Sequence, residues 1–300
     1  MSIPFQNGRI DHLAGPPFLP VSVDVLRLDL VHPVVSGNKW FKLKRYLQEA
    51  EQQSRKTLLT FGGAYSNHIV ATAAAAQMHG LKSIGIIRGE EPAAWSHTLQ
   101  AAKGFGMELF FVSREDYRQK RIPHEVFFHH KQKDVYVIAE GGYGEKGAEG
   151  AAEILKGFDT TSYSHIVTAV GTGTTLAGLV NASQPHQQVI GIPVLKGAHS
   201  LQQEIESLLP EEKKAAFQLL HDYHFGGYAK HSPELLHFMN EAFQQYLLPT
   251  DFVYTAKALF AVFDLAKKEF FQPSEKVLFV HTGGLQGNAS LPKGTLIFGT

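Results

Sequence analysis

The chain has 300 residues, of which 44% are hydrophobic and 19% are charged, so it can form a large core and is not generally disordered. Lysine plus arginine equals aspartate plus glutamate at 28 each, and this balance gives no electrostatic footprint for nucleic acid or an anionic membrane. Cysteine is absent, which excludes disulfides and thiolate metal sites. We therefore expect a protein that recognises a small ligand.

The beginning of the chain bears on its location. The segment from Met1 to Gly8 lacks the basic and apolar run of a secretion signal. No apolar stretch approaches the ~20 residues that a membrane-spanning helix needs. We expect a cytoplasmic protein with neither a membrane nor a nucleic acid as partner.

Short apolar runs rich in valine, isoleucine and phenylalanine alternate with longer helical patterns along the chain. The expected strands are 23–28, 57–61, 83–87, 108–112, 135–138, 165–170, 188–192 and 276–280. The expected helices include 41–53, 67–79, 150–155 and 256–270. This alternation predicts an α/β protein with open, twisted, mostly parallel sheets flanked by helices. Eight strands exceed one ordinary doubly wound unit, so we expect two domains: a large one of residues 1–42 plus 141–300, and a smaller inserted α/β domain of residues 43–140.

The first of four glycine-rich turns, Ser36 to Lys39, precedes a predicted helix. A lone lysine is usually a solvated surface residue. At a helix amino terminus, however, the dipole disfavours a cation and favours the neutral amine, which is the form that attacks an aldehyde. Lys39 is therefore a candidate nucleophile, whereas Lys42, Lys44 and Arg45 fit a solvated helix face.

The second turn, Phe61 to His68, follows a predicted strand and leads into an alanine-rich helix. Ser66 or Asn67 suits the N-cap of that helix, and capping is the common role of such residues. The same helix end presents free backbone N–H groups to an anion. The carboxylate of an amino-acid substrate would suit this position.

The third turn, Val170 to Gly178, combines small residues, hydroxyls and backbone donors between a buried strand and a helix, as a phosphate cradle does. It is not a P-loop, because no Gly-Lys-Ser/Thr follows. Leu176 stands at the third glycine position of the dinucleotide fingerprint, so a single phosphate fits better than a pyrophosphate. A tight structural turn is the alternative.

The fourth turn, Val280 to Gly287, ends the final predicted strand and places the hydroxyl of Thr282 at its carboxyl end. Ligands of open α/β sheets collect at the carboxyl ends of strands. Thr282 is therefore expected in the ligand crevice, and a polar strand terminus with a glycine bend is the alternative reading.

Taken in order, these turns resemble one family, that of 1-aminocyclopropane-1-carboxylate deaminase and D-cysteine desulfhydrase. The resemblance is carried by Gly37-Asn38-Lys39 with Lys42-Leu43, by Gly62-Gly63 to His68, by Gly171 to Thr175, and by His281 to Gly284. These are fold type II pyridoxal-phosphate enzymes, similar in plan to the tryptophan synthase β chain. The resemblance spans nearly the whole chain and implies pyridoxal 5′-phosphate bound by the large domain, a small amino-acid substrate and a homodimer.

The resemblance also implies how the cofactor is held. Lys39 carries it as a Schiff base and moves the proton at the substrate α-carbon. Asn67 bonds the phenolic oxygen of its ring, and Thr282 is the expected partner of the ring nitrogen. The phosphate is expected on Gly171, Thr172, Gly173, Thr174 and Thr175.

For the substrate, the resemblance implies that Ser66 and His68, next to Asn67, meet the carboxylate. Tyr228 and Tyr254 match the two active-site tyrosines of the family and are expected to assist the leaving group or the nucleophile. Tyr254 is the firmer match, because a short polar motif before a helix follows it.

The position after the second tyrosine bears on the reaction. The deaminases have an acidic residue there that keeps the ring nitrogen protonated, whereas this chain has Thr255. A hydroxyl holds a pyridinium less well than a carboxylate does, and opening a cyclopropane needs more charge delocalisation than expelling a thiolate. We therefore expect a D-cysteine desulfhydrase that forms pyruvate, sulfide and ammonia. Ring opening of 1-aminocyclopropane-1-carboxylate to 2-oxobutanoate and ammonia is the alternative.

The sequence also leaves room for functions other than that of a D-cysteine desulfhydrase. Three segments depart from the family pattern: the Val70 region, the residues after Tyr228, and Leu26 to Leu30. A catalytically idle cofactor-binding protein, or a nucleotide-binding α/β protein, therefore stays open. We expect no metal site, because the offset of five between His124 and His129 does not place both rings on one helical face.

Overall fold

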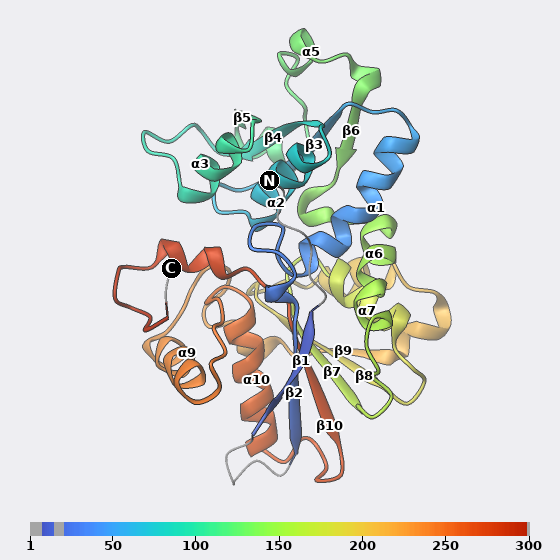
Figure 1. The fold of residues 1–300 in the computed structure, drawn as a ribbon, viewed down its shortest axis with the longest axis vertical. Coiled ribbons are helices and arrows are strands. Elements are labelled where there is room, and N and C mark those ends of the chain that lie inside the picture. Colours follow the sequence, from blue (N-terminus) through green and yellow to red (C-terminus); the bar gives the residue numbers. More distant parts are fainter. Residues whose placement is uncertain (1–7, 15–20, 299–300) are drawn as a thin grey trace.

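A computed structural model describes residues 8–14 and 21–298 and confirms the α/β class, with two mostly parallel sheets flanked by helices (Figure 1). Residues 1–7, which hold most of the segment judged for a secretion signal, lie outside the described residues. In the described part of the chain, every helix is too short or too polar to cross a bilayer.

The large sheet has six strands in the order β1-β2-β10-β7-β8-β9, and all neighbours are parallel except β1 and β2. Its strands are β1 (Arg9–Leu13), β2 (Ser22–Arg27), β7 (His165–Val170), β8 (Gln188–Pro193), β9 (Phe217–Leu219) and β10 (Lys276–His281). The two edge strands, β1 and β9, are absent from the sequence prediction. β1 is interrupted by charged residues and β9 has only three residues, so neither has the apolar run that marks the buried strands.

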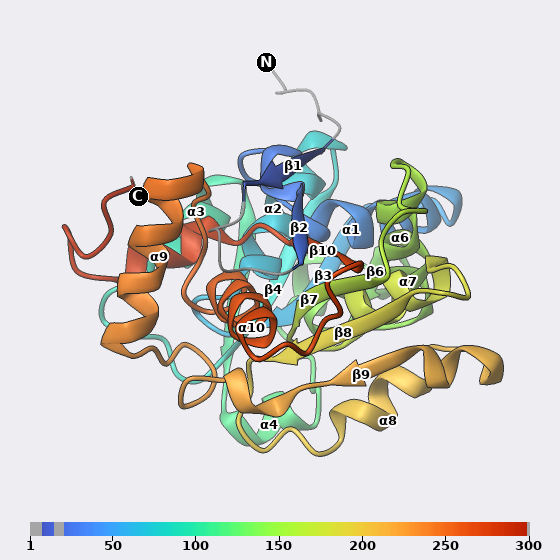
Figure 2. The same ribbon diagram turned by 90° about the horizontal axis from the view of Figure 1, so that it is seen from below.

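Helices cover both faces of the large sheet, as Figure 2 shows, with α9 and α10 on one side and α6 and α7 on the other. These helices are α6 (Glu145–Lys156), α7 (Thr174–Ala182), α8 (Leu201–Glu206), α9 (Pro233–Tyr246) and α10 (Thr255–Lys267). Alternate residues of a strand point to opposite faces. Val167 and Phe279 accordingly pack towards α10, whereas Ile166 and Leu278 pack towards α6 and α7.

The small sheet has four parallel strands in the order β5-β4-β3-β6. They are β3 (Thr57–Gly62), β4 (Lys82–Arg88), β5 (Met107–Val112) and β6 (Val135–Ile138). Its helices are α1 (Asn38–Gln52), α2 (Asn67–Met78), α3 (His97–Gly104), α4 (Arg114–Arg118) and α5 (Val126–His129). Leu58 packs against α1 and α2, whereas Leu59 packs on the opposite face near α4.

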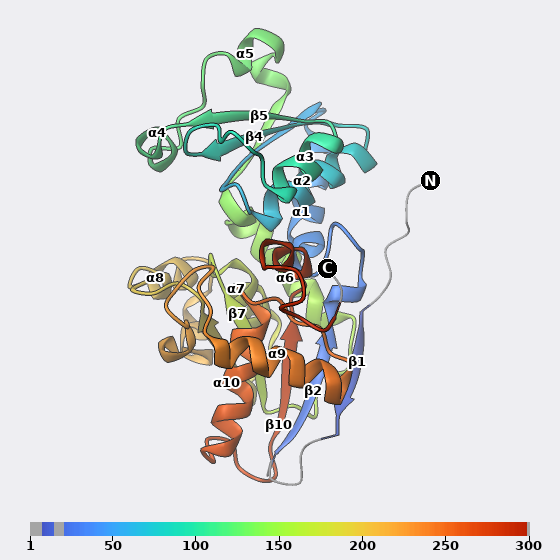
Figure 3. The same cartoon turned by 90° about the vertical axis from the view of Figure 1, so that its left-hand side faces the viewer.

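The two sheets lie one above the other, with α1 and α6 between them (Figure 3). Two glycines bring the central helices close together. A Cβ at Gly150 of α6 would lie 2.1 Å from the carbonyl oxygen of Phe41 on α1, and one at Gly178 of α7 would lie 2.5 Å from Ala151 of α6. The division into domains after residues 42 and 140 stays a prediction.

Candidate active site

A cavity of about 490 Å³ lies where the carboxyl ends of β3, β7 and β10 meet the amino ends of α1, α2 and α7. Thr174 is buried behind this cavity, with its hydroxyl 3.3 Å from that of Thr172. The other residues predicted for the site all line the cavity. They are Lys39, Ser66, Asn67, His68, Gly171, Thr172, Gly173, Thr175, Tyr228, Tyr254 and Thr282.

The amino end of α1 is tied to β10 and α7, and this fixes Lys39. The backbone N–H of Asn38 donates to the carbonyl of Thr282 at 3.2 Å, and its side-chain amide donates to the Thr175 hydroxyl at 2.8 Å. Gly37 permits this approach, because a Cβ there would stand 1.8 Å from the Thr282 oxygen. The Lys39 ammonium nitrogen donates to Asn38 Oδ1 at 2.9 Å.

The pKa of Lys39 is lowered to about 8 by burial, against an opposing effect of Asp251. The predicted direction is therefore right, although removal from water is the larger cause and the helix dipole is not needed to explain it. About a tenth of Lys39 is then the neutral amine at pH 7, and about half at pH 8. Such an amine can attack an aldehyde.

Lys42 corrects the prediction of a solvated face. Its side chain is buried, and its ammonium group donates to the carbonyl of Gly141. Burial, and then the nearby Lys39, lower its pKa well below the usual value. Residues three apart share one helix face, so the spacing from Lys39 was an available signal. Lys44 and Arg45 do stay partly exposed and pair with Glu153.

The turn after β3 places the amino end of α2 at the cavity. Ser66 holds the predicted N-cap position, although its hydroxyl caps no N–H group of the described residues. The buried Asn67 Oδ1 has no hydrogen-bond partner within residues 8–14 and 21–298. Polar atoms of this kind are rare in folded proteins and point to a missing partner such as a ligand or water.

His68 is buried, and its tautomer follows from its neighbour. The Thr60 hydroxyl donates to the carbonyl of Ile138 at 2.9 Å, so it accepts from His68 Nε2, also at 2.9 Å. Nδ1 is then an acceptor, with no partner in the described part of the chain. Burial, and then Lys42 and Lys39, lower the pKa of His68 well below its usual value. A neutral acceptor does not suit a carboxylate, so the backbone N–H groups of α2 suit that role better.

The turn after β7 has the geometry of an anion site. Gly173 adopts φ 79° and forms the N-cap of α7, where a Cβ would lie 2.5 Å from Ile205. Gly171 lies against the ring of Tyr254, which a Cβ would approach to 3.2 Å. Helix geometry leaves the N–H groups of the first turn of α7 without a partner inside the helix, so they can bind an anion.

Tyr228 and Tyr254 lie together, with ring centroids 6.0 Å apart and planes at 74°. Burial raises the pKa of both phenols, and that of Tyr254 well above its usual value. The segment that carries Tyr228 is held by Lys257, which donates to the carbonyls of His224 at 2.9 Å and Gly227 at 2.8 Å. Because their pKa values are raised, both phenols are protonated at neutral pH and can donate hydrogen bonds.

Thr255 does not reach the cavity, because its hydroxyl donates to Asp251 at 2.8 Å and also accepts the Asp251 N–H. Asp251 is fully buried, and its carboxylate also accepts the N–H groups of Val253, Tyr254 and Thr255. It thus serves the amino end of α10. Thr282 is the side chain that lines the cavity at the end of β10.

Several lining residues were not predicted, notably Arg88 and Glu140. Arg88 is the last residue of β4, and its Nη2 would stand 3.6 Å from a Cβ at Gly63. Its guanidinium carbon lies 5.8 Å from the centroid of the Tyr117 ring. Both Arg88 and Glu140 stand at the carboxyl ends of small-sheet strands, so the rule that identified Thr282 applies to them as well.

Comparison with known proteins agrees with this geometry. A family model described as "Pyridoxal-phosphate dependent enzyme" matches residues 23–283. A protein of Thermotoga maritima named "Putative 1-aminocyclopropane-1-carboxylate deaminase" is 35% identical, over 89% of each chain. A "D-cysteine desulfhydrase" of Klebsiella pneumoniae is 28% identical, over 91% of this chain and 88% of its own. The solved structure of an "ACC deaminase homologue" is 28% identical and has a TM-score of 0.81, covering 94% of this chain and 91% of its own.

Proposed function

Because the chain belongs to the family of pyridoxal-phosphate-dependent enzymes, we propose that it converts D-cysteine and water to pyruvate, sulfide and ammonia. Within that family it groups with 1-aminocyclopropane-1-carboxylate deaminases and D-cysteine desulfhydrases. The expected family, enzyme class and cofactor are thereby confirmed. The choice between the two substrates is the proposal.

The residues of the cavity fit pyridoxal phosphate. A half-buried amine with a pKa of about 8 suits its aldehyde, and the glycine turn at the amino end of α7 suits its phosphate. Asn67 Oδ1, which has no partner among the described residues, can accept a hydrogen bond from the phenolic hydroxyl of the ring. We assign these contacts to Lys39, to Gly171–Thr175 and to Asn67, with Thr282 at the ring nitrogen. When bound, the ring supplies an electron sink for charge developed at the substrate α-carbon.

The choice of D-cysteine as substrate rests on the hydroxyl of Thr282 at the end of β10. Thr282 lines the cavity there, whereas the nearby carboxylate of Asp251 is occupied by four donors at the start of α10. A hydroxyl stabilises a protonated ring nitrogen less than a carboxylate does. The weaker electron sink suits expulsion of a thiolate, which is a good leaving group, better than opening of a carbon ring.

The chain's own groups then divide the work. The Lys39 amine is placed to hold the proton removed from the substrate α-carbon. The N–H groups at the start of α2 bind the substrate carboxylate, and the guanidinium of Arg88 adds positive charge above Gly63. The phenols of Tyr228 and Tyr254 donate hydrogen bonds to the departing sulfur.

The test is keto-acid release by the cofactor-loaded protein. D-cysteine, L-cysteine and 1-aminocyclopropane-1-carboxylate are assayed in parallel, with the Lys39→Ala variant as the blank. We expect equal amounts of pyruvate and sulfide from D-cysteine, and little from the other two compounds. Turnover of L-cysteine in preference to D-cysteine would contradict the proposed stereochemistry.

Ring opening is the second candidate function, because the Thermotoga maritima relative, at 35% identity, bears the name of a deaminase. 2-Oxobutanoate from the cyclopropane substrate, without pyruvate from D-cysteine, would replace the proposal by this candidate. It would also mean that Thr282 supports a stronger electron sink than its neutral hydroxyl suggests.

A further inference from the structure

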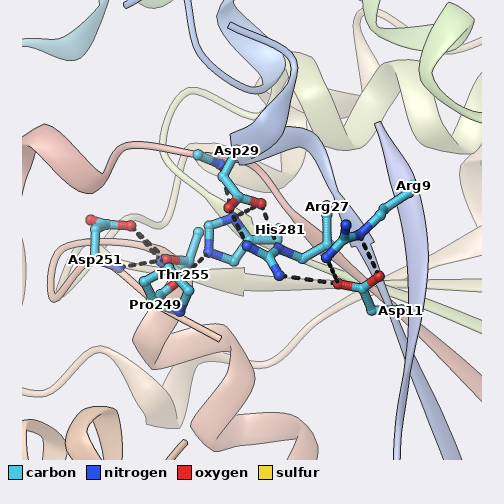
Figure 4. Close-up of polar contacts among 9 residues, drawn as sticks. Arg9, Asp11, Arg27, Asp29, Pro249, Asp251, Thr255 and His281 are labelled. Carbon is cyan, nitrogen blue, oxygen red and sulfur yellow. Dashed lines mark hydrogen bonds and ion pairs between the residues drawn. The ribbon is translucent and has the colours of Figure 1, made fainter. Parts of the chain in front are cut away.

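A series of charged side chains runs from the edge of the large sheet to the end of β10 (Figure 4). Arg9 pairs with Asp11 at 2.7 Å, and Asp11 pairs with Arg27 at 3.1 Å. Arg27 holds Asp29 through two hydrogen bonds of 2.8 and 2.7 Å, and Asp29 Oδ1 lies 3.3 Å from His281 Nδ1. The exposed fraction falls from 65% at the Arg9 side chain to 0% at that of His281.

Stability alone does not account for this buried arrangement. The side chains of Arg27, Asp29 and His281 are 7%, 2% and 0% exposed. Burial by itself would raise the pKa of Asp29, but His281 and Arg27 outweigh it and hold that pKa below its usual value. Removing such charges from water costs free energy of the same order as the pairing returns, and apolar replacements are often no less stable. A specific geometry is the better reason for such a cluster.

His281 joins two segments of the active site. Its Nε2 lies 2.8 Å from the carbonyl oxygen of Pro249, which can only accept, so Nε2 carries a proton. Pro249 begins the segment that leads through Asp251 to Tyr254. On the other side of the ring, Nδ1 lies 3.3 Å from Asp29 Oδ1 and 3.3 Å from the Gly283 nitrogen. With a proton on Nδ1 the ring donates to the Asp29 carboxylate, and without that proton Nδ1 accepts the N–H of Gly283 instead. Asp29 therefore orients the ring in the form that carries a proton on Nδ1.

The residue after His281 is Thr282, whose carbonyl accepts the N–H of Asn38 beside Lys39. The loop before Asn38 is also fixed from the Asp29 side, because the N–H of Gly37 donates to the carbonyl of Leu28 at 3.1 Å. Leu28 and Asp29 belong to one short 3₁₀ turn, Leu28–Leu30. The same few contacts therefore set the relative places of Lys39, Thr282 and Tyr254.

We propose that His281, oriented by Asp29, is a positioning residue that holds Thr282 and the segment leading to Tyr254 in fixed relation to Lys39. The inference rests on the proposed place of the cofactor ring between Lys39 and Thr282, and does not depend on which amino acid is the substrate. Displacements of about 1 Å in such a site lower turnover on the order of 100-fold. Asp29 and Arg27 act only through His281 and touch no ligand.

The test compares four variants of the cofactor-loaded protein. Asp29→Asn removes the charge that orients the ring, and His281→Gln retains an N–H donor for the Pro249 carbonyl. Thr282→Val is the benchmark for losing the ring-nitrogen contact. Asp24→Asn is the matched control, because Asp24 lies on β2 shortly before Asp29 and its side chain is only 17% exposed, but it bonds Tyr163 and His12 instead.

The readouts are the pH titration of the bound cofactor's absorbance, kcat and KM, and the thermal midpoint. We expect Asp29→Asn and His281→Gln to move the spectral titration in the direction of Thr282→Val. We expect kcat to fall about 10-fold to 100-fold while KM changes by less than about threefold. The Asp24→Asn control should leave both kcat and the pH titration of the cofactor's absorbance unchanged.

Two outcomes would overturn the inference in distinguishable ways. If Thr282→Val moves the titration but Asp29→Asn and His281→Gln change only the thermal midpoint, the cluster is merely structural. If Thr282→Val leaves the titration unchanged, the proposed place of the cofactor ring is wrong, and the positioning role fails with it. Neither outcome depends on turnover of D-cysteine. Should His281→Gln not fold, Asp29→Asn alone decides, since it changes no side-chain volume appreciably.

Discussion

The two ends of the cavity differ in how their polar groups find partners. At the end of β10, Asp29, His281 and Asp251 are buried and bonded to other parts of the chain. At the amino end of α2, the buried Asn67 Oδ1 and His68 Nδ1 have no partner among the residues that the structure describes. At the β10 end the fold itself supplies the hydrogen-bond partners of the buried groups. At the α2 end, buried acceptor atoms are available to a ligand.

The difference teaches which contacts the protein preorganises. Buried polar groups are nearly always bonded, so an unpartnered group in a cavity is expected to meet a ligand or water. A bonded cluster instead holds its members rigidly before anything binds. Changes at the β10 end should therefore act on kcat and on the cofactor, and changes at the α2 end should act mainly on KM.

The largest effect on activity is expected from removing the Lys39 amine, which serves both ends of the cavity. Lys39→Ala should lower keto-acid release by about 10³-fold or more, because it removes both the cofactor attachment and the proton carrier. The measurement is steady-state release together with the absorbance of the protein after gel filtration. An attached, normal chromophore in this variant would contradict the assignment of Lys39.

Removing the phenol hydroxyl of Tyr254 or Tyr228 tests the β10 end of the cavity. Tyr254→Phe should lower kcat about 100-fold, in the range typical of a single acid or base group, while KM changes little. Tyr228 is 40% exposed, so its phenol is less firmly held, and Tyr228→Phe should have the smaller effect. Steady-state kinetics of the two variants measure the difference. Equal losses, confined to KM, would place both phenols on the substrate-binding side instead.

Substitution of Arg88, a cation that the sequence did not predict for the site, tests the α2 end of the cavity. Arg88→Ala should raise KM about 10-fold to 100-fold with kcat nearly unchanged, because a charge-assisted hydrogen bond contributes about 1.5–3 kcal/mol. Arg88→Lys keeps the charge and should recover part of the loss. A kcat that falls while KM stays constant would group Arg88 with the β10 end instead.

The smallest expected effect concerns the pH dependence of cofactor loading. Burial lowers the pKa of Lys39 to about 8, so the amine is protonated below that pH and neutral above it. The rate at which the cofactor-free protein takes up pyridoxal phosphate should rise about fivefold from pH 7 to 8, and less than about twofold from pH 8 to 9. Stopped-flow absorbance measures this rate. A continued tenfold rise up to pH 10 would mean an unperturbed lysine.

The glycine turns that line the cavity were readable in the sequence. The turns that hold Lys39, Gly171–Thr175 and Thr282 follow a simple rule, because ligands of parallel sheets gather at strand ends and glycines allow close approach there. The helix 41–53 was predicted three residues late, since α1 begins at Asn38. Gly37 and the bond from Asn38 to Thr282 start it earlier, and neither is visible in helical periodicity. The site roles of individual residues, the domain boundaries and the homodimer stay predictions.

The sequence by itself determined the α/β class and the glycine turns, because each depends on residue types at short spacing. The order of those turns along the chain carried the resemblance that implied the family and the cofactor. Only the tertiary structure decided that Lys42 is buried against Gly141 and that Asp29 meets His281. Asp29 and His281 stand near opposite ends of the chain, and the parallel pairing of β2 with β10 brings them together. Burial and charge state depend on such distant neighbours, and local pattern holds no information about which neighbours those will be.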